Sequence, residues 1–388
     1  MKVLKRIIIA FLAIVMLAVI GAYVTGNDHL ISGIPKTYLK GKTGPDIDDF
    51  SDFHNETIVP GAVHPWKTAD NYNLSELPEK ALLAHSQLES VAFLVLKEGE
   101  IIFEKYWEDY SEDSFSNSFS MAKSIVGMTI GIAINEGKIK SVDQNISDFI
   151  PQFKNGPNST VTIEQLLQMK SNIAFDEKYK DPFGFMAKAY YGDDLINKTL
   201  SYAVEGTPGT KWQYLGGNTL LLAIILERAT GQSIHEYVQE KLWKPMGAKN
   251  KALWSTDEKG GFEKAYCCFY SNARDFARFG QMYLCQGNFN GKQIIPSNWV
   301  DATLTPVVLD NTEKTKISHY GYQWWLGTHN GMDFSAMRGI LGQYVIIVPD
   351  KEMVIVRLGH KRSNKKLRHT PIEVYDYIDE AIAISENQ

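Results

Sequence analysis

Two groups of predicted strands lie at opposite ends of this chain, with a mostly helical region between them. Apolar runs at 91–96 and 101–107 flank a Gly-containing turn at 97–100, a pattern typical of a β-hairpin. Further strands are predicted near the C-terminus at 322–326, 334–337, 343–348 and 353–358. We therefore expect an α/β (α+β) fold in which strands from both ends form one antiparallel sheet, flanked by helices and interrupted by an inserted helical region. A functional cleft is expected between the sheet and the helices.

The chain begins with a basic and then apolar segment typical of an export signal or membrane anchor. Lys2, Lys5 and Arg6 precede an uncharged run from Ile7 to Val24, which is about long enough to span a bilayer. Good signal-peptidase sites are lacking, so we predict an uncleaved anchor in the cell membrane. Its basic end would lie in the cytoplasm and the rest of the protein outside, in a periplasmic or extracellular space. Cleavage would instead give a secreted protein.

Three regions are predicted along the chain. Residues 1–26 form the anchor. Residues 27–80 are rich in Gly, Pro, Asp and Asn, and are expected to form a tether and an irregular N-terminal wrap. Residues 81–388 form the main domain, which ends in a predicted helix at 370–384.

A serine and a lysine in the sequence Ser120-Met121-Ala122-Lys123 are the strongest candidates for chemistry. A Ser-rich lead passes here into an apolar stretch through Ile134, which predicts a buried helix. Residues three apart share a helix face, so the Lys123 amine is expected beside the Ser120 hydroxyl. A lysine held in an apolar site can lose its proton near neutral pH and act as the base that activates a hydroxyl. The alternative is a capping serine followed by a solvent-facing lysine.

A Gly-rich loop at 208–218 provides a second candidate. It runs into an apolar helix from Thr219 to Ala229 and places Tyr214 near the helix start. Loops held by a rigid scaffold often carry function, so Tyr214 is predicted to carry a proton beside Ser120. The alternative is an ordinary packed tyrosine.

Composition and missing motifs exclude several classes of function. The net charge of −5 gives no indication of a nucleic-acid partner. No metal-ligand pattern or phosphate-binding loop occurs, so neither a metal nor a cofactor is predicted. Adjacent Cys267 and Cys268 would point to opposite sides of a strand, so these two and Cys285 are expected to be free, buried thiols. The sequence leaves the oligomeric state open.

Three motifs in order along the chain resemble those of one enzyme superfamily. These are 120–123, then Pro208-Gly209-Thr210-x-Trp212-x-Tyr214, then the Gly-rich stretch 339–343. Together they resemble the serine β-lactamase and penicillin-binding-protein superfamily. The match is to its class C-like branch, which includes esterases, D-amino-acid peptidases and nylon-oligomer (6-aminohexanoate-dimer) hydrolases. Stretches 272–280 and 339–343 are most similar to the last of these, and the resemblance covers roughly residues 85–360.

This resemblance implies a role for each matching residue. Ser120 would be the nucleophile that accepts the acyl group, Lys123 its general base and Tyr214 the proton carrier to the leaving group. The backbone N–H groups of Ser120 and Ile340 would form the oxyanion hole. Contacts with the substrate would come from Tyr179, Gly339 and Arg338. The implied substrates are small amides or esters, with the membrane as a further partner through the N-terminal segment.

Two motifs depart from the β-lactamase pattern. The usual Tyr-x-Asn has Gly216 in place of the asparagine, and the usual Lys-Thr-Gly reads Met337-Arg338-Gly339. The missing side chains are ones that grip a β-lactam, so efficient β-lactamase activity is not expected.

Three hypotheses remain open from the sequence. The first is a membrane-anchored serine hydrolase that cleaves small amides or esters through an acyl-enzyme. The second is a sensor-like module that binds a cell-wall peptide or β-lactam and acylates slowly or not at all. The third is a structural export protein, which leaves the ordered motifs unexplained.

Overall fold

A seven-stranded sheet forms the centre of the protein in the computed structural model, which describes residues 1–386. The strand order is β12-β13-β14-β15-β3-β4-β2, and every pairing is antiparallel except that of the two-residue strand β2 with β4. The C-terminal strand β15 pairs directly with β3, so strands from both ends of the chain meet as predicted. The strand bounds are β2 Lys67–Thr68, β3 Ser90–Lys97, β4 Glu100–Tyr106, β12 Trp325–His329, β13 Met332–Gly339, β14 Gln343–Val348 and β15 Met353–Gly359.

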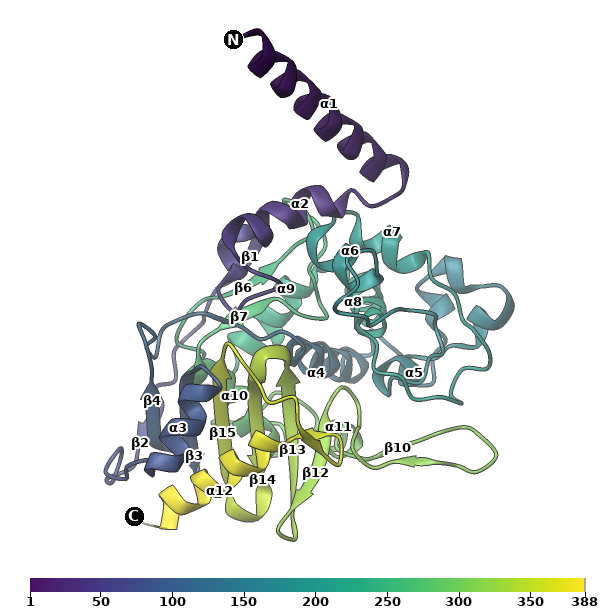
Figure 1. Ribbon diagram of the computed structural model, residues 1–388. Helices are drawn as coiled ribbons and strands as arrows, with labels where there is room; N and C mark the ends of the chain where they lie inside the picture. The colour runs from purple at the N-terminus through teal and green to yellow at the C-terminus, as the bar shows by residue number, and fades with distance from the viewer. Residues whose placement is uncertain (387–388) are drawn as a thin grey trace.

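Helices cover both faces of this sheet (Figure 1). Helices α3 (Glu79–Gln87) and α12 (Ile372–Glu386) cover one face, where Phe93, Ile346 and Ile355 form part of a buried cluster. Helices α4 (Met121–Asn135) and α10 (Ala273–Leu284) cover the other face. Because both faces are covered, β14 and β15 are buried along their whole length, and their residues are mostly apolar instead of alternating with polar ones.

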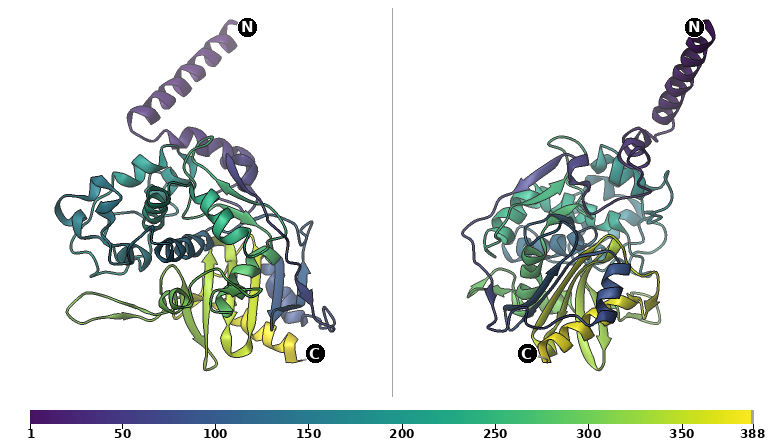
Figure 2. Two further views of the ribbon diagram at one scale, coloured as in Figure 1. Left: turned by 180° about the vertical axis from the view of Figure 1, so that it is seen from behind. Right: turned by 60° about the vertical axis from the view of Figure 1, so that its left-hand side comes forward.

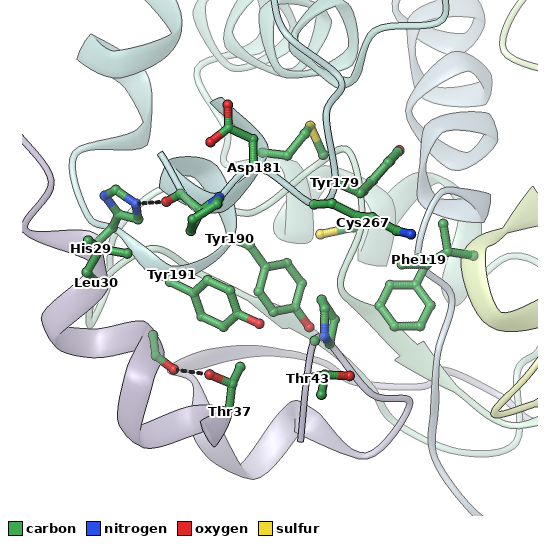
Figure 3. A pocket seen from close by; sticks show the side chains of 18 of the residues that line it. His29, Leu30, Thr37, Thr43, Phe119, Tyr179, Asp181, Tyr190, Tyr191 and Cys267 are labelled. Carbon is green, nitrogen blue, oxygen red and sulfur yellow. Dashed lines mark hydrogen bonds between the residues drawn. The ribbon is translucent and has the colours of Figure 1, made fainter. Parts of the chain in front are cut away.

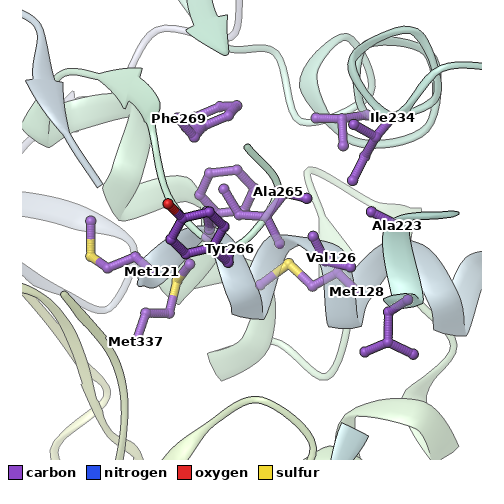
Figure 4. Close-up of a cluster of buried hydrophobic side chains, with 14 of the residues drawn as sticks. Met121, Val126, Met128, Ala223, Ile234, Ala265, Tyr266, Phe269 and Met337 are labelled. Carbon is purple, nitrogen blue, oxygen red and sulfur yellow. The ribbon is translucent and has the colours of Figure 1, made fainter. Parts of the chain in front are cut away.

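The inserted region is mostly helical and packs around α4 (Figure 2). Residues 121–133 of α4 are all buried, and Figure 4 shows the apolar side chains that surround this helix. The other helices of this region are α5 Ile163–Leu167, α6 Phe185–Tyr191, α7 Leu195–Leu200, α8 Gly216–Thr230 and α9 Ile234–Val238. A second sheet has the order β1-β6-β7-β5, with bounds β1 Asn55–Ile58, β5 Ser116–Asn117, β6 Ala252–Ser255 and β7 Phe269–Ser271.

The remaining elements are short and lie near the edges. They are α11 Ser297–Thr303, β8 Asn288–Phe289, β9 Lys292–Gln293, β10 Val307–Val308, β11 Lys316–Ile317, β16 Lys366–Leu367 and β17 Thr370–Pro371.

The N-terminal segment forms helix α1 (Lys2–Val24), which extends away from the body (Figures 1 and 2). It has 23 residues, is strongly apolar and has no buried residue, so by length and composition it is able to cross a membrane. A second helix, α2 (His29–Lys36), follows after four residues and packs on α6. The sequence predicted an irregular wrap here. Gly33 lets this helix lie directly on the Tyr191 ring.

Candidate active site

The side chains of Ser120 and Lys123 meet at the start of α4. Ser120 occupies the N-cap position, and the Lys123 Nζ atom donates hydrogen bonds of 2.9 Å to the Ser120 Oγ atom and to the Tyr266 carbonyl oxygen. Lys123 is only 1% exposed, and no carboxylate of residues 1–386 forms an ion pair with it. Ser120 is partly exposed. The arrangement is therefore a reachable hydroxyl held against a buried amine.

A tight backbone bend presents Ser120 to solvent. The preceding residue, Phe119, has a φ of 43°, in the left-handed region. The buried Asn117 side chain holds this bend, because its Oδ1 atom accepts hydrogen bonds from the backbone N–H groups of Phe119 (2.9 Å) and Cys268 (3.1 Å). Its Nδ2 atom donates to the Tyr270 hydroxyl at 3.1 Å. Asn117 thus ties residues 117–120 to the neighbouring strand; we call these residues the nucleophile segment, after the role predicted for Ser120.

Tyr214, which the sequence predicted beside Ser120, has its ring next to the Lys123 amine. The Lys123 Nζ atom is 5.1 Å from the centroid of the Tyr214 ring. Trp325 and Tyr320 hold the ring from the other side, with centroid separations of 5.1 and 6.0 Å. Tyr214 is half-buried, and helix α8 starts two residues later at Gly216.

The end of β13 lies directly against the nucleophile segment. A Cβ atom added at Gly339 would overlap the Ser118 carbonyl oxygen and lie 3.2 Å from the Phe119 Cβ atom. Only glycine fits this contact, which explains the Gly-rich signal in the sequence. The next residue, Ile340, lines the same cavity as Ser120.

Two further side chains of the loop before α6 complete the site. Tyr179 is half exposed and lines the cavity, and its hydroxyl donates to a Glu177 carboxylate oxygen at 2.5 Å. The other Glu177 oxygen accepts from the backbone N–H of Gly216, the first residue of α8, at 2.6 Å. Burial raises the pKa of Glu177, and the positive charge of Lys123 acts against that increase. Sequence reasoning missed Glu177 because no local pattern marks it.

The structure does not bring the Arg338 side chain to this cavity. Its position on β13 alternates with Met337, and it shares a sheet face with Phe334 and Ala336, which pack on the side of α12. The guanidinium lies 4.0 Å from the Trp325 ring centroid and donates to the His369 carbonyl oxygen at 3.2 Å. Burial lowers the pKa of Arg338 to about 10.

An apolar cavity of about 430 Å³ opens beside Ser120 (Figure 3). One wall comes from the nucleophile segment and from Tyr266 and Cys267. The opposite wall comes from α2 and from the loop and helix around α6. The lining there includes His29, Leu30, Ile34, Pro182, Met186 and Tyr191. This volume suits a small molecule or one part of a larger one.

The cysteine prediction was wrong. Cys267 and Cys268 form a disulfide, and Cys285 is free but exposed. The reason is local backbone geometry, because Cys268 has a φ of 64° and the chain turns here instead of running as a strand. This turn follows Tyr266, whose carbonyl oxygen binds Lys123.

One group of side chains has the geometry of a cation site. Asp46, Asp48 and His360 lie close together, but His360 Nδ1 is hydrogen-bonded to Asp46 at 2.8 Å and the Tyr110 hydroxyl donates to Asp48 at 2.6 Å. These groups satisfy one another and lie outside the Ser120 cavity.

Comparisons with known proteins find a matching family model and several similar proteins. The beta-lactamase family model matches residues 79–376. A 6-aminohexanoate-dimer hydrolase of Paenarthrobacter ureafaciens is 29% identical over 285 residues, which cover 69% of this chain and 72% of that protein. A solved structure of a Bacillus anthracis protein assigned as a 6-aminohexanoate-dimer hydrolase has 24% identity and a TM-score of 0.68, covering 87% of this chain and 92% of that one. A family VIII carboxylesterase has the same fold, with 16% identity, a TM-score of 0.62 and coverage of 85% and 100%.

Proposed function

The chain belongs to the beta-lactamase family of serine hydrolases, and from that premise we propose that it cleaves small amides or esters through an acyl-enzyme on Ser120. The observation that carries this proposal is the 2.9 Å contact between the Ser120 hydroxyl and the buried Lys123 amine. A hydroxyl becomes a good nucleophile when a base beside it removes its proton. The Lys123 amine is in direct contact with the Ser120 hydroxyl and is the base that we propose.

In the proposed acylation, three side chains act in turn. Lys123 takes the proton from the Ser120 Oγ atom, which attacks the substrate carbonyl carbon. The carbonyl oxygen becomes negative and receives hydrogen bonds from the N–H groups of Ser120 and Ile340. The bond to the leaving amine or alcohol then breaks, and Tyr214 passes it the proton held by Lys123.

Deacylation uses the same groups in reverse. A water molecule gives a proton to Lys123 or Tyr214 and attacks the Ser120 ester. The acid is released and the proton returns to the Ser120 oxygen. Each cycle consumes one water molecule, and the enzyme ends in its starting protonation state.

The surroundings of Ser120 support a proposal for the substrate class. Arg338 packs away from the cavity and Gly216 replaces the usual motif asparagine, so the groups that grip a β-lactam ring and its carboxylate are missing. The relative that is 29% identical acts, by its name, on the 6-aminohexanoate dimer. A linear amide or ester is the substrate that this cavity supports best.

We propose that α1 anchors the enzyme in the cell membrane. Lys2, Lys5 and Arg6 precede its apolar run, and basic residues favour the cytoplasmic side. The catalytic domain then lies outside the cytoplasm.

The test is turnover by the full chain in detergent with p-nitrophenyl butyrate and a matching anilide, beside Ser120→Ala and Lys123→Met. We expect hydrolysis that both substitutions reduce by at least about 10³-fold, since a nucleophile and its base act as a unit. Turnover that persists in Ser120→Ala would overturn the proposal. A stable Ser120 adduct without turnover would favour the sensor-like alternative instead.

A further inference from the structure

The wall of the Ser120 cavity opposite the nucleophile is built by the segment that directly follows the membrane helix. His29, Leu30, Gly33, Ile34 and Thr37 of this segment all line the cavity. Figure 3 shows His29, Leu30 and Thr37 on the same side of the cavity as Tyr191 and away from Phe119. The anchor and the substrate site are therefore parts of one continuous structure.

Two contacts fix α2 in this place. The His29 Nε2 atom is hydrogen-bonded to the Pro182 carbonyl oxygen at 2.7 Å. Burial lowers the pKa of His29, which favours the neutral ring as a donor in this bond. Gly33 lies against the Tyr191 ring, where an added Cβ atom would approach within 3.1 Å. The helix is thus docked as a wall of the cavity.

The distance between the cavity and the membrane is short. Only residues 25–28 separate α1 from α2. Four residues span at most about 14 Å when extended, and the headgroup layer of a bilayer is about 5–8 Å thick. The α2 side of the cavity therefore lies at or near the membrane surface.

Apolar side chains are exposed around this side of the cavity. Ile34 lines the cavity and is still 45% exposed, while Tyr38 and Leu39 just beyond α2 are 68% and 77% exposed. Phe183, next to the cavity-lining Pro182, is also exposed. An exposed apolar patch next to an apolar cavity marks a surface that meets lipid or an apolar ligand.

We infer that the substrate is an amphiphile, an ester or amide with a long apolar chain, which enters from the membrane that holds α1. Its chain lies along α2 between Ile34 and Met186, and its carbonyl group reaches Ser120. This inference rests on the proposed function, because the chemistry at Ser120 is the hydrolysis described above.

The first experiment compares p-nitrophenyl acetate and octanoate with the full chain in detergent. Each fully buried methylene adds up to about fourfold to kcat/KM, so burial of three gives a preference of about 60-fold for octanoate. Ile34→Asp places a charge in the wall and should lower the ratio of kcat/KM for octanoate to that for acetate at least about tenfold. Ile34→Gln, which is polar but uncharged, should lower this ratio less. Ile31→Asp is the matched control, because Ile31 is exposed on the same helix but does not line the cavity.

The second experiment tests the membrane as the source. The full chain is placed in phosphatidylcholine vesicles, with 4-methylumbelliferyl palmitate in the same vesicles or in separate ones. We expect hydrolysis at least about tenfold faster in the shared membrane. Equal rates would overturn delivery from the membrane.

The outcomes separate this inference from the proposed function. Ser120-dependent hydrolysis of acetate with no preference for octanoate would overturn the inference and leave the proposed function standing. An octanoate preference that Ile34→Asp and Ile31→Asp leave equally unchanged would also overturn it. Absence of any Ser120-dependent hydrolysis would overturn both.

Discussion

The contact between Gly339 and the nucleophile segment leads to a sharp prediction. Gly339 has a φ of −115°, which any residue adopts, so space alone excludes a side chain here. A Cβ atom would overlap the Ser118 carbonyl oxygen, and an ordinary separation requires the two backbones to part by about 1 Å. The N–H of Ile340, one residue on, would then move away from Ser120.

Gly339→Ala should therefore reduce kcat far more than its small size suggests. A misplacement of about 1 Å costs about 10²-fold in rate, and loss of one oxyanion-hole donor costs about 10²–10³-fold. We expect kcat for p-nitrophenyl butyrate to fall about 10²-fold, which is about 2.7 kcal/mol in activation free energy. Overpacking should also lower the free energy of unfolding by about 1–3 kcal/mol.

Gly127→Ala is the control for this experiment. Gly127 lies on α4, and a Cβ atom there would make ordinary contacts with Gln323 at 3.4 and 3.5 Å. Alanine also favours a helix interior over glycine by about 0.5–1 kcal/mol. We expect this variant to have the kcat of the native protein and a free energy of unfolding that is at least as high. A folded Gly339→Ala variant with the kcat of the native protein would refute the placement of the oxyanion hole at the end of β13.

Three further perturbations test other parts of the account. Tyr214→Phe should lower kcat by about 10²–10⁴-fold, the usual range for proton transfer by a side chain; an unchanged kcat with either an ester or an anilide would remove Tyr214 from the mechanism. Asn117→Ala should lower the free energy of unfolding in urea by about 2–6 kcal/mol, because the buried N–H groups of Phe119 and Cys268 lose their acceptor; a loss below about 1 kcal/mol would contradict this. The hydrogen bond between Asp46 and His360 lowers the pKa of Asp46 and raises that of His360. The raised pKa of His360 stabilises the fold below about pH 6.5. This stabilisation is lost as the pH rises through the pKa that His360 has in the folded protein. The lowered pKa of Asp46 stabilises the fold above about pH 4, and this contribution is lost as the pH falls. The melting temperature of the native protein should therefore fall between pH 6 and 8, and Asp46→Asn should make this fall smaller. A fall identical to that of the native protein would contradict a stabilising role for the hydrogen bond between Asp46 and His360.

Much of the fold could be predicted because its signals are local. The hairpin of β3 and β4 and the strands β14 and β15 follow from apolar runs and a Gly-containing turn, and their observed bounds differ from the prediction by at most one residue. Strand β12 was predicted three residues too early. Helix α2 could not be read, because it contains Gly33 and Pro35 and depends on packing against Tyr191.

Some contacts of the candidate site could be predicted from the local sequence, and others could not. The Ser120–Lys123 contact follows from helical spacing, so the sequence predicted it. Asn117 and Glu177 act through residues far away in the chain, Cys268 and Gly216, and no local pattern marks such contacts. The sheet face on which the Arg338 side chain lies could have been predicted, because successive residues of a strand alternate and Met337 lies on the other face.

In the proposed mechanism Ser120 carries the acyl group, and trapping that species tests the mechanism. The full chain is mixed with p-nitrophenyl butyrate, quenched in acid within the first turnovers and analysed by intact mass and peptide mapping. We predict a butyryl adduct on Ser120 that is absent from Ser120→Ala and strongly reduced in Lys123→Met. Hydrolysis that proceeds with no adduct, or with an adduct on another residue, would contradict the account.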